Sequence, residues 1–295
     1  ESTSDEVVEV RNPADPEDLV GHITYTSEAD IHAAMDAARD GFSQWSAVPA
    51  EQRAEMIRKV GDLYEENVHE LFALTTREAG KSLLDAVAEI REAVDFAMYY
   101  ANEGIRYKDD GQARGVMCCI SPWNFPLAIF TGQILANLAA GNAVLAKPAE
   151  QTSLLAVRAV ELMHQAGIPK AAVQLLPGTG ATVGSALTSD ARVTGVCFTG
   201  STATAQRINK AMAENMAPDA PLVAETGGLN AMIVDSTALP EQVVRNYLPA
   251  LDVAVVPLTD AWARRALKIG VRNLESLSVT ARQMLEHLTA REGSR

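Results

Sequence analysis

The fold is decided by residues 115–148, "GVMCCISPWNFPLAIFTGQILANLAAGNAVLAKP", where two apolar runs flank a longer helical stretch. The runs at 115–121 and 142–148 are short and apolar almost throughout, which is typical of strands buried on both faces. A strand, a helix and a second strand in this order predict a right-handed βαβ unit with parallel strands.

The same alternation extends over residues 115–235. Further strand-like runs occur at 172–178, 195–200, 221–228 and 230–235, and helical stretches lie at 126–141 and 153–167. Apolar strands separated by amphipathic helices predict an α/β fold, a doubly wound, Rossmann-like parallel sheet with helices on both faces.

Residues 27–105 predict an N-terminal helical layer. Ser27 and Asp30 form a capping-box arrangement at the first helix start, and Pro49 opens a second helical stretch that Gly80 ends. A third helical stretch covers 81–104.

Composition excludes several classes of function. The chain of 295 residues is 47% apolar and 21% charged, with a net charge of −13, so nucleic acid and anionic membranes are poor partners. No run approaches the roughly 18–20 apolar residues of a membrane span, and the acidic N-terminus is unlike a signal peptide. We expect a cytoplasmic protein.

In a doubly wound sheet the ligand lies beyond the carboxyl ends of the strands. Five of the strand-like runs end in polar or Gly-rich turns, which favours a binding site there. The candidates are Ser121, Pro122, Trp123, Asn124, Lys147, Glu150, Gly178, Gly180, Gly200, Ser201, Glu225 and Gly227.

Two of these turns are suited to phosphate. Gly178, Gly180 and Gly184 approach the G-x-G-x-x-G fingerprint but with one residue too many, and an ordinary strand-to-helix turn has this pattern equally often. At "FTGST", Ser201 and the free N–H groups of a helix start would suit a pyrophosphate.

Three side chains suggest more specific chemistry. Lys147 can donate to ribose hydroxyls while Glu150 accepts from them and repels a 2′-phosphate, which favours NAD over NADP; a solvated Lys–Glu pair is the alternative. Asn124, between aromatic and proline residues, is a fit amide donor for an oxyanion, or else it bonds its own turn.

Five motifs in this order, "ISPWNFPLAIF", "LAKPAEQT", "LLPGTG", "FTGST" and "AETGGLNAMIVDSTALPEQVV", resemble the NAD-dependent aldehyde dehydrogenases. They look closest to the L-glutamate γ-semialdehyde (pyrroline-5-carboxylate) dehydrogenase domain of bifunctional proline-utilisation enzymes. The resemblance covers about residues 9–246, and we treat residues 1–246 as one NAD-binding domain.

The resemblance implies a role for each matched residue. Glu225 would be the general base and Asn124 the oxyanion donor. The implied cofactor contacts are Ser121, Pro122, Trp123, the ribose binders Lys147 and Glu150, the Gly178, Gly180 and Gly184 turn, the pyrophosphate turn at Gly200 and Ser201, and Gly227 beside the nicotinamide.

The family's nucleophile is absent from this chain. A relative carries it after the Glu within a phrase like Gly-Gln-x-Cys, whereas the three cysteines here are Cys118, Cys119 and Cys197, which we expect to be buried and unreactive. Their spacing indicates neither a metal site nor a disulfide framework. Leu229 and Ala205 are smaller departures from the family pattern.

Residues 247–295 match no part of the family that we recognise. Apolar side chains at 4-3 spacing from Leu267 to Leu288 predict a helical tail that covers the domain or binds a partner chain or a second copy. Three interpretations remain open: a truncated or chimeric dehydrogenase that is inactive alone, a non-catalytic dinucleotide-binding or regulatory protein, and an interaction scaffold.

Overall fold

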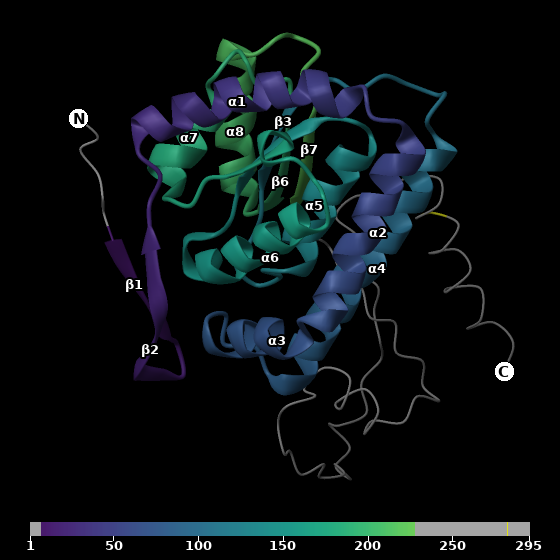
Figure 1. The fold of residues 1–295 in the computed structure, drawn as a ribbon. Helices are drawn as coiled ribbons and strands as arrows, with labels where there is room; N and C mark the ends of the chain where they lie inside the picture. Colours follow the sequence, from purple (N-terminus) through teal and green to yellow (C-terminus); the bar gives the residue numbers. More distant parts are fainter. Residues whose placement is uncertain (1–6, 228–281, 283–295) are drawn as a thin grey trace, which may run out of the picture. The chain divides into compact units, whose positions relative to one another are not determined.

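The computed structural model describes residues 7–227 and residue 282. Its main feature is a parallel five-stranded sheet, of which Figure 1 labels β3, β6 and β7. The strand order is β5-β4-β3-β6-β7. The strands are β3 (Val116–Ile120), β4 (Ala143–Lys147), β5 (Val173–Leu175), β6 (Gly195–Gly200) and β7 (Leu222–Thr226).

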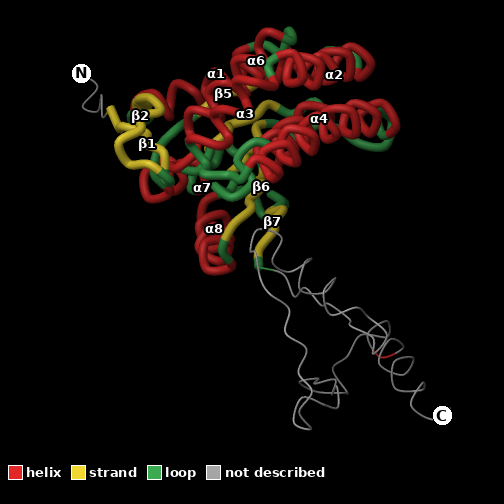
Figure 2. The backbone as a smooth tube through the Cα atoms, turned by 90° about the horizontal axis from the view of Figure 1, so that it is seen from below, coloured by secondary structure: helices red, strands yellow, loops and turns green. Residues whose placement is uncertain are grey.

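Helices cover both faces of this sheet, which confirms the predicted doubly wound α/β fold (Figures 1 and 2). One face packs on α5 and α6, with α2 and α4 outside them, and the other packs on α1, α7 and α8. The helices are α1 (Glu28–Ser46), α2 (Ala50–Glu66), α3 (Val68–Arg77), α4 (Leu83–Arg106), α5 (Ala128–Ala139), α6 (Ser153–Gln165), α7 (Ser185–Thr188) and α8 (Thr202–Asn215).

The strands are apolar because they lie between these two layers. Every residue of β3 and β4 is buried, and successive side chains alternate between the two cores. Cys118 therefore faces the core with α1, while Cys119 faces the core with α5.

The predicted helix starts in the N-terminal layer are correct, but one break was not foreseen. The Ser27 hydroxyl accepts from the Asp30 N–H at 3.2 Å, and Pro49 precedes α2. The predicted second helix is two helices, because at Asn67 the side-chain amide donates to the Leu63 carbonyl at 2.8 Å, a local bond that competes with helix continuation.

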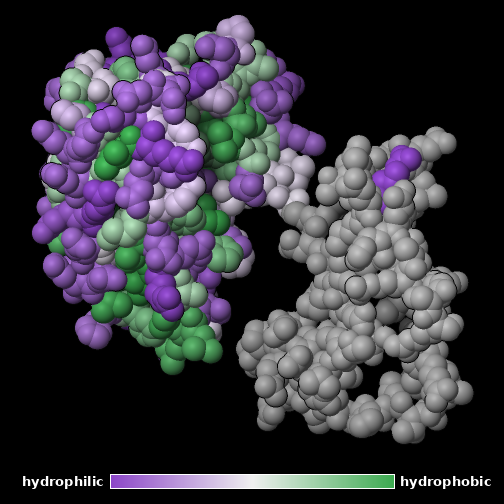
Figure 3. Space-filling model, turned by 90° about the vertical axis from the view of Figure 1, so that its right-hand side faces the viewer, coloured by the Kyte–Doolittle hydropathy of each residue, from purple (hydrophilic) through white to green (hydrophobic). Residues whose placement is uncertain are grey.

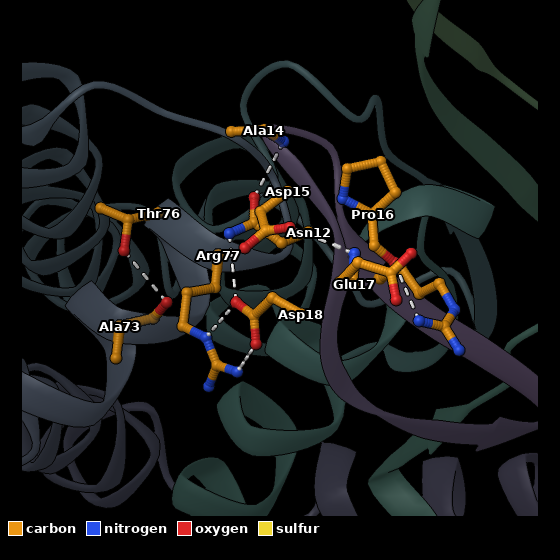
Figure 4. Close-up of polar contacts among 10 residues, drawn as sticks. Asn12, Ala14, Asp15, Pro16, Glu17, Asp18, Ala73, Thr76 and Arg77 are labelled. Atoms are coloured by element: carbon orange, nitrogen blue, oxygen red, sulfur yellow. Dashed lines mark hydrogen bonds and ion pairs between the residues drawn. The ribbon is translucent and has the colours of Figure 1, made fainter.

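An antiparallel hairpin precedes the helical layer and was also not foreseen. It consists of β1 (Val7–Asn12) and β2 (Asp15–Thr24). Figure 4 shows the bond that ties it to α3, in which the Asp18 carboxylate accepts from Arg77 Nε at 2.9 Å. Within the hairpin, the same carboxylate accepts from Asn12 Nδ2 at 3.1 Å. The hydrogen bonds from Arg77 and Asn12 lower the pKa of Asp18 to about 2.

Several sequence predictions fall outside the described residues, namely the strand at 230–235, Leu229 and the helical tail at 247–295. Among the helices of residues 7–227, none combines the length and the hydropathy that crossing a bilayer requires. The face drawn in Figure 3 is largely hydrophilic, and its apolar areas are interrupted by polar ones.

Candidate functional site

A cleft of about 570 Å³ lies at the carboxyl ends of β3, β4, β6 and β7, where the topology of the sheet predicts a ligand. We call it the strand-end cleft. The predicted site residues that line it are Ser121, Pro122, Trp123, Asn124, Lys147, Glu150, Gly200, Ser201, Glu225 and Gly227. They come from four strand ends and are brought together by the fold alone.

Lys147 is the buried cation of this cleft. Its residue is only 4% exposed, and the ammonium donates to the Pro148 carbonyl at 2.9 Å. An ammonium has three N–H donors. No carboxylate among the described residues lies within ion-pair distance of it, and burial lowers the pKa of the side chain.

Glu150 lies on the same wall and touches the predicted glycine turn. Its Oε1 accepts from the Gly180 N–H at 2.8 Å. One carboxylate oxygen is thus used to fix the turn, and the nearby negative charge partly offsets the effect of burial on Lys147.

The predicted turn glycines stand behind the cleft wall rather than among its lining residues. Gly178 has a φ of +152°, and a side chain there would meet Val183 at 2.5 Å, so its absence of a Cβ is a backbone requirement. Gly180 contacts Glu150, and a Cβ on Gly184 would meet the Lys147 stem at 3.8 Å. The Gly180 N–H thus fixes the Glu150 carboxylate, and the predicted phosphate contacts of the three glycines stay a prediction.

The second predicted turn, at Gly200 and Ser201, does open into the cleft. The Ser201 hydroxyl caps α8 by accepting from the Thr204 N–H at 3.2 Å. The first N–H groups of α8 have no acceptor within the helix, so the positive end of the helix dipole is available to an anion.

A buried carboxylate fixes the loop that carries Asn124. Glu89 of α4 accepts from the N–H groups of Leu127 and Ala128 at 3.1 Å each, and so caps the start of α5. Lys81 completes this support: its ammonium is 3.4 Å from Glu89 and 4.4 Å from the centre of the Phe125 ring.

A second buried carboxylate supports the wall that carries Glu150. Glu78 accepts from the N–H groups of Leu154 and Leu155 at 2.7 Å each, at the start of α6. Burial raises the pKa of Glu78 to about 7, against the lowering effect of these two bonds. Neither Glu78 nor Glu89 was predicted, because each acts on a helix distant in sequence and no local motif announces that contact.

Glu225 is exposed near the end of β7, opposite Thr199 of β6. Thr199 itself accepts from Gln133 Nε2 at 3.0 Å, so the strand beside Glu225 is anchored to α5. An exposed carboxylate in a cleft can take a proton from water.

The expected burial is confirmed for Cys118 and Cys119 but not for Cys197. Burial raises the pKa of Cys118 to about 12, and the neighbouring Cys197 together with burial raises that of Cys119. Cys197 is only partly buried, and a hydrogen bond from Cys119, supported by Asn137, lowers its pKa to about 7. None of the three lines the strand-end cleft.

Sequence reasoning missed other residues that line the cleft: Ala149, Gln151, Phe198, Thr199, Thr204 and Thr226. Most are neighbours of predicted residues and could have been found by extending each strand end by one position. Thr204 could have been found from the Ser-x-x-Thr spacing of a helix cap.

The arrangement fits a dinucleotide. A buried ammonium with unused donors and a partly used carboxylate suit ribose hydroxyls, while a helix N-terminus suits a pyrophosphate. At Gly200 a Cβ would meet the Phe198 ring at 2.6 Å, so the turn before α8 has no room for a side chain at this position.

Comparison with known proteins agrees with this chemistry. The model of the aldehyde dehydrogenase family matches residues 1–251. Bifunctional protein PutA of Klebsiella aerogenes is 50% identical over 249 residues, which are 82% of this chain and 19% of that protein. The 1-pyrroline-5-carboxylate dehydrogenase of Geobacillus sp. (strain WCH70) is 34% identical over 253 residues, 80% of this chain and 49% of that enzyme.

A solved structure gives the same picture. The 1-pyrroline-5-carboxylate dehydrogenase from Thermus with bound NAD superposes with a TM-score of 0.72 at 34% identity, covering 76% of this chain and 47% of that one. The chain thus spans about a fifth of the length of the bifunctional relative and about half of the dehydrogenases.

Proposed function

This chain belongs to the aldehyde dehydrogenase family, and on that premise we propose that it supplies the NAD-binding part of an enzyme oxidising L-glutamate γ-semialdehyde in proline catabolism. The reaction would be that of the 1-pyrroline-5-carboxylate dehydrogenases it resembles. On its own the chain would bind cofactor without turnover.

One observation carries the cofactor proposal: Lys147 is a buried cation with a single hydrogen bond to the described part of the chain and a cleft beside it. Leaving an ammonium buried with unused donors is costly unless something accepts from them. Ribose hydroxyls would do so, and Glu150 beside Lys147 would accept in return. A 2′-phosphate would bring a second negative charge toward Glu150, so NAD is favoured over NADP.

The catalytic proposal assigns two further roles. NAD, when bound, supplies the hydride acceptor. Asn124 would donate from its amide to the oxygen of the aldehyde carbon, and Glu225 would take a proton from the water that releases the acid. Neither Cys119 nor Cys197 lines the cleft, and the sequence has no cysteine after Cys197. Covalent capture of the aldehyde therefore lacks a thiol in this chain.

Two other functions fit parts of the same site. A dinucleotide-binding protein without catalysis would use Lys147 and Glu150 in the same way but need neither Asn124 nor Glu225. A scaffold would need no cofactor, and its cleft would bind neither NAD nor NADP.

Calorimetry separates these functions. We expect NAD to bind more tightly than NADP, and Lys147→Met to weaken NAD binding by about 10–100-fold, the effect of losing a charge-assisted bond worth about 1.5–3 kcal/mol. Lys170→Met, at an exposed lysine after α6, is the matched control and should leave affinity unchanged. No binding of either dinucleotide would support the scaffold.

Turnover is tested separately, with glutamate semialdehyde and NAD. We expect no NADH formation above background, even when the cofactor is bound. Turnover that disappears in Cys197→Ala would contradict the proposed inactivity and identify a substitute nucleophile.

A further inference from the structure

Two thiols lie side by side on adjacent strands of the sheet. Cys119 of β3 and Cys197 of β6 are directly paired in the parallel register, so both side chains are on the same face of the sheet. Neighbouring strands lie about 4.8 Å apart, which is inside the Cα separation of about 4.4–6.8 Å that a disulfide allows.

One side-chain amide holds both sulfurs. Asn137 of α5 places Nδ2 3.4 Å from Cys119 Sγ and 3.4 Å from Cys197 Sγ. The same amide also donates to the Gln133 carbonyl at 2.8 Å, which fixes its position. The two sulfurs are thus oriented toward a common point rather than apart.

The third cysteine is separated from this pair. Cys118 is adjacent in sequence but points to the opposite face, where it is completely buried against the core with α1. It can join neither of the other two thiols without reversing the strand.

The pair is also chemically asymmetric. Cys197 is partly exposed and accepts from the Asn137 amide at 3.4 Å, and its contacts with Cys119 and Asn137 lower its pKa, which favours the thiolate. Cys119 is almost completely buried and stays protonated. Cys197 is therefore the thiol suited to attack an oxidant, and Cys119 is placed to react with the oxidised Cys197.

We propose that Cys119 and Cys197 form a reversible dithiol–disulfide site that reacts with small hydroperoxides. The Cys197 thiolate attacks the outer oxygen of the peroxide, the O–O bond breaks, and the other oxygen leaves as hydroxide or alkoxide that takes up a proton. Cys119 then attacks the sulfenic sulfur of Cys197, and the S–S bond forms as water leaves. With hydrogen peroxide, two thiols and one peroxide give one disulfide and two waters.

Exposure of the whole chain to hydrogen peroxide, followed by intact-mass measurement and non-reducing peptide mapping, tests the site. We expect the mass to fall by about 2 Da through loss of two hydrogens, and a crosslink between the peptides of Cys119 and Cys197. Dithiothreitol should restore both thiols. Three free thiols after this exposure, or a disulfide that contains Cys118, would overturn the proposal.

Single substitutions assign the two steps. Cys118→Ser should leave the disulfide unchanged. Cys119→Ser should abolish it and leave a sulfenic acid on Cys197 that dimedone traps, because attack no longer has a resolving thiol. Equal dimedone labelling of the unsubstituted protein and Cys119→Ser would contradict the resolving role of Cys119. The peptide map of the unsubstituted chain tests the site independently of how the variants fold.

Discussion

The strand-end cleft contrasts with a larger cleft at the opposite end of the sheet. The larger one, of about 970 Å³, lies where the strands begin, between the ends of α1, α2, α4 and α5. We call it the helix-end cleft. Each cleft is lined by one buried cation, Lys147 in the smaller and Arg53 in the larger.

The two cations differ in how far the protein already satisfies them. Arg53 donates from Nε to the Ala139 carbonyl at 3.3 Å and from Nη1 to the Val48 carbonyl, so it caps the end of α5. Within residues 7–227, Lys147 makes a single hydrogen bond, to the Pro148 carbonyl. The size of a cleft therefore does not identify the binding site here. In the smaller cleft the Lys147 ammonium retains unused N–H donors, whereas in the larger cleft the Arg53 guanidinium is bound to backbone carbonyls.

The largest effect should follow from Arg53→Met. The buried Ala139 carbonyl and the partly buried Val48 carbonyl lose their donor, which at about 1–3 kcal/mol each lowers the free energy of unfolding by about 2–6 kcal/mol. Urea denaturation measures this loss, and Lys59→Met at an exposed position of α2 is the control. NAD affinity of the folded variant should not change; a weaker affinity would show that the helix-end cleft also serves the cofactor.

Glu78, which supports the wall of the strand-end cleft, should make the stability of the folded chain depend on pH. Its pKa of about 7 is above the unfolded value of 4.5, so the folded state binds the proton more tightly, and the stability this group contributes is lost as pH rises from 4.5 through 7. Between these two pKa values, the loss in the free energy of unfolding is at most about 3 kcal/mol.

Denaturation at pH 5 and pH 7.5 checks this sign. The unsubstituted chain should lose more stability between these values than Glu78→Gln, whose side chain does not titrate. Glu66→Gln, at the exposed end of α2, should keep the slope of the unsubstituted chain. Parallel curves for all three proteins would disprove the role of Glu78.

A smaller change is expected from Glu150→Gln. The amide oxygen can still accept from Gly180, so the turn is kept while the charge that repels a 2′-phosphate is removed. The preference for NAD over NADP should fall by about fivefold, roughly 1 kcal/mol, measured by calorimetry with both dinucleotides. An unchanged ratio would mean that Glu150 does not face the ribose.

The smallest effect on stability is expected from Lys147→Met. The substitution removes a buried charge that lacks an ion-pair partner among the described residues, so the free energy of unfolding should stay within about 1 kcal/mol or rise. A loss as large as that of Arg53→Met would erase the distinction between the two cations.

Those parts of the fold and of the strand-end cleft that depend on residues close together in the sequence could be predicted, and those that depend on distant residues could not. Strands, helix starts and the residues at strand ends are encoded locally, so β3 to β7, Ser27 and most of the strand-end cleft were predictable. The hairpin at 7–24 was not, because its alternation is masked by charged residues on both strands. The capping by Glu78 and Glu89 was not predictable either, since it depends on which helix packs against which.

The order of strands in the sheet has a consequence for the sequence of folding events. β3, β4 and β5 are neighbours in both chain and sheet, whereas β6 crosses back so that Gly195 pairs with Met117. Pairing β6 with β3 closes a longer loop of chain than pairing β4 with β3, and closing a longer loop costs more entropy. We therefore expect β6 to dock after β3 and β4 have paired. The side of the strand-end cleft that carries Lys147 would then form before the turn at Gly200. In a pulse-labelling experiment, the amides of β4 should gain protection from hydrogen exchange ahead of those of β6.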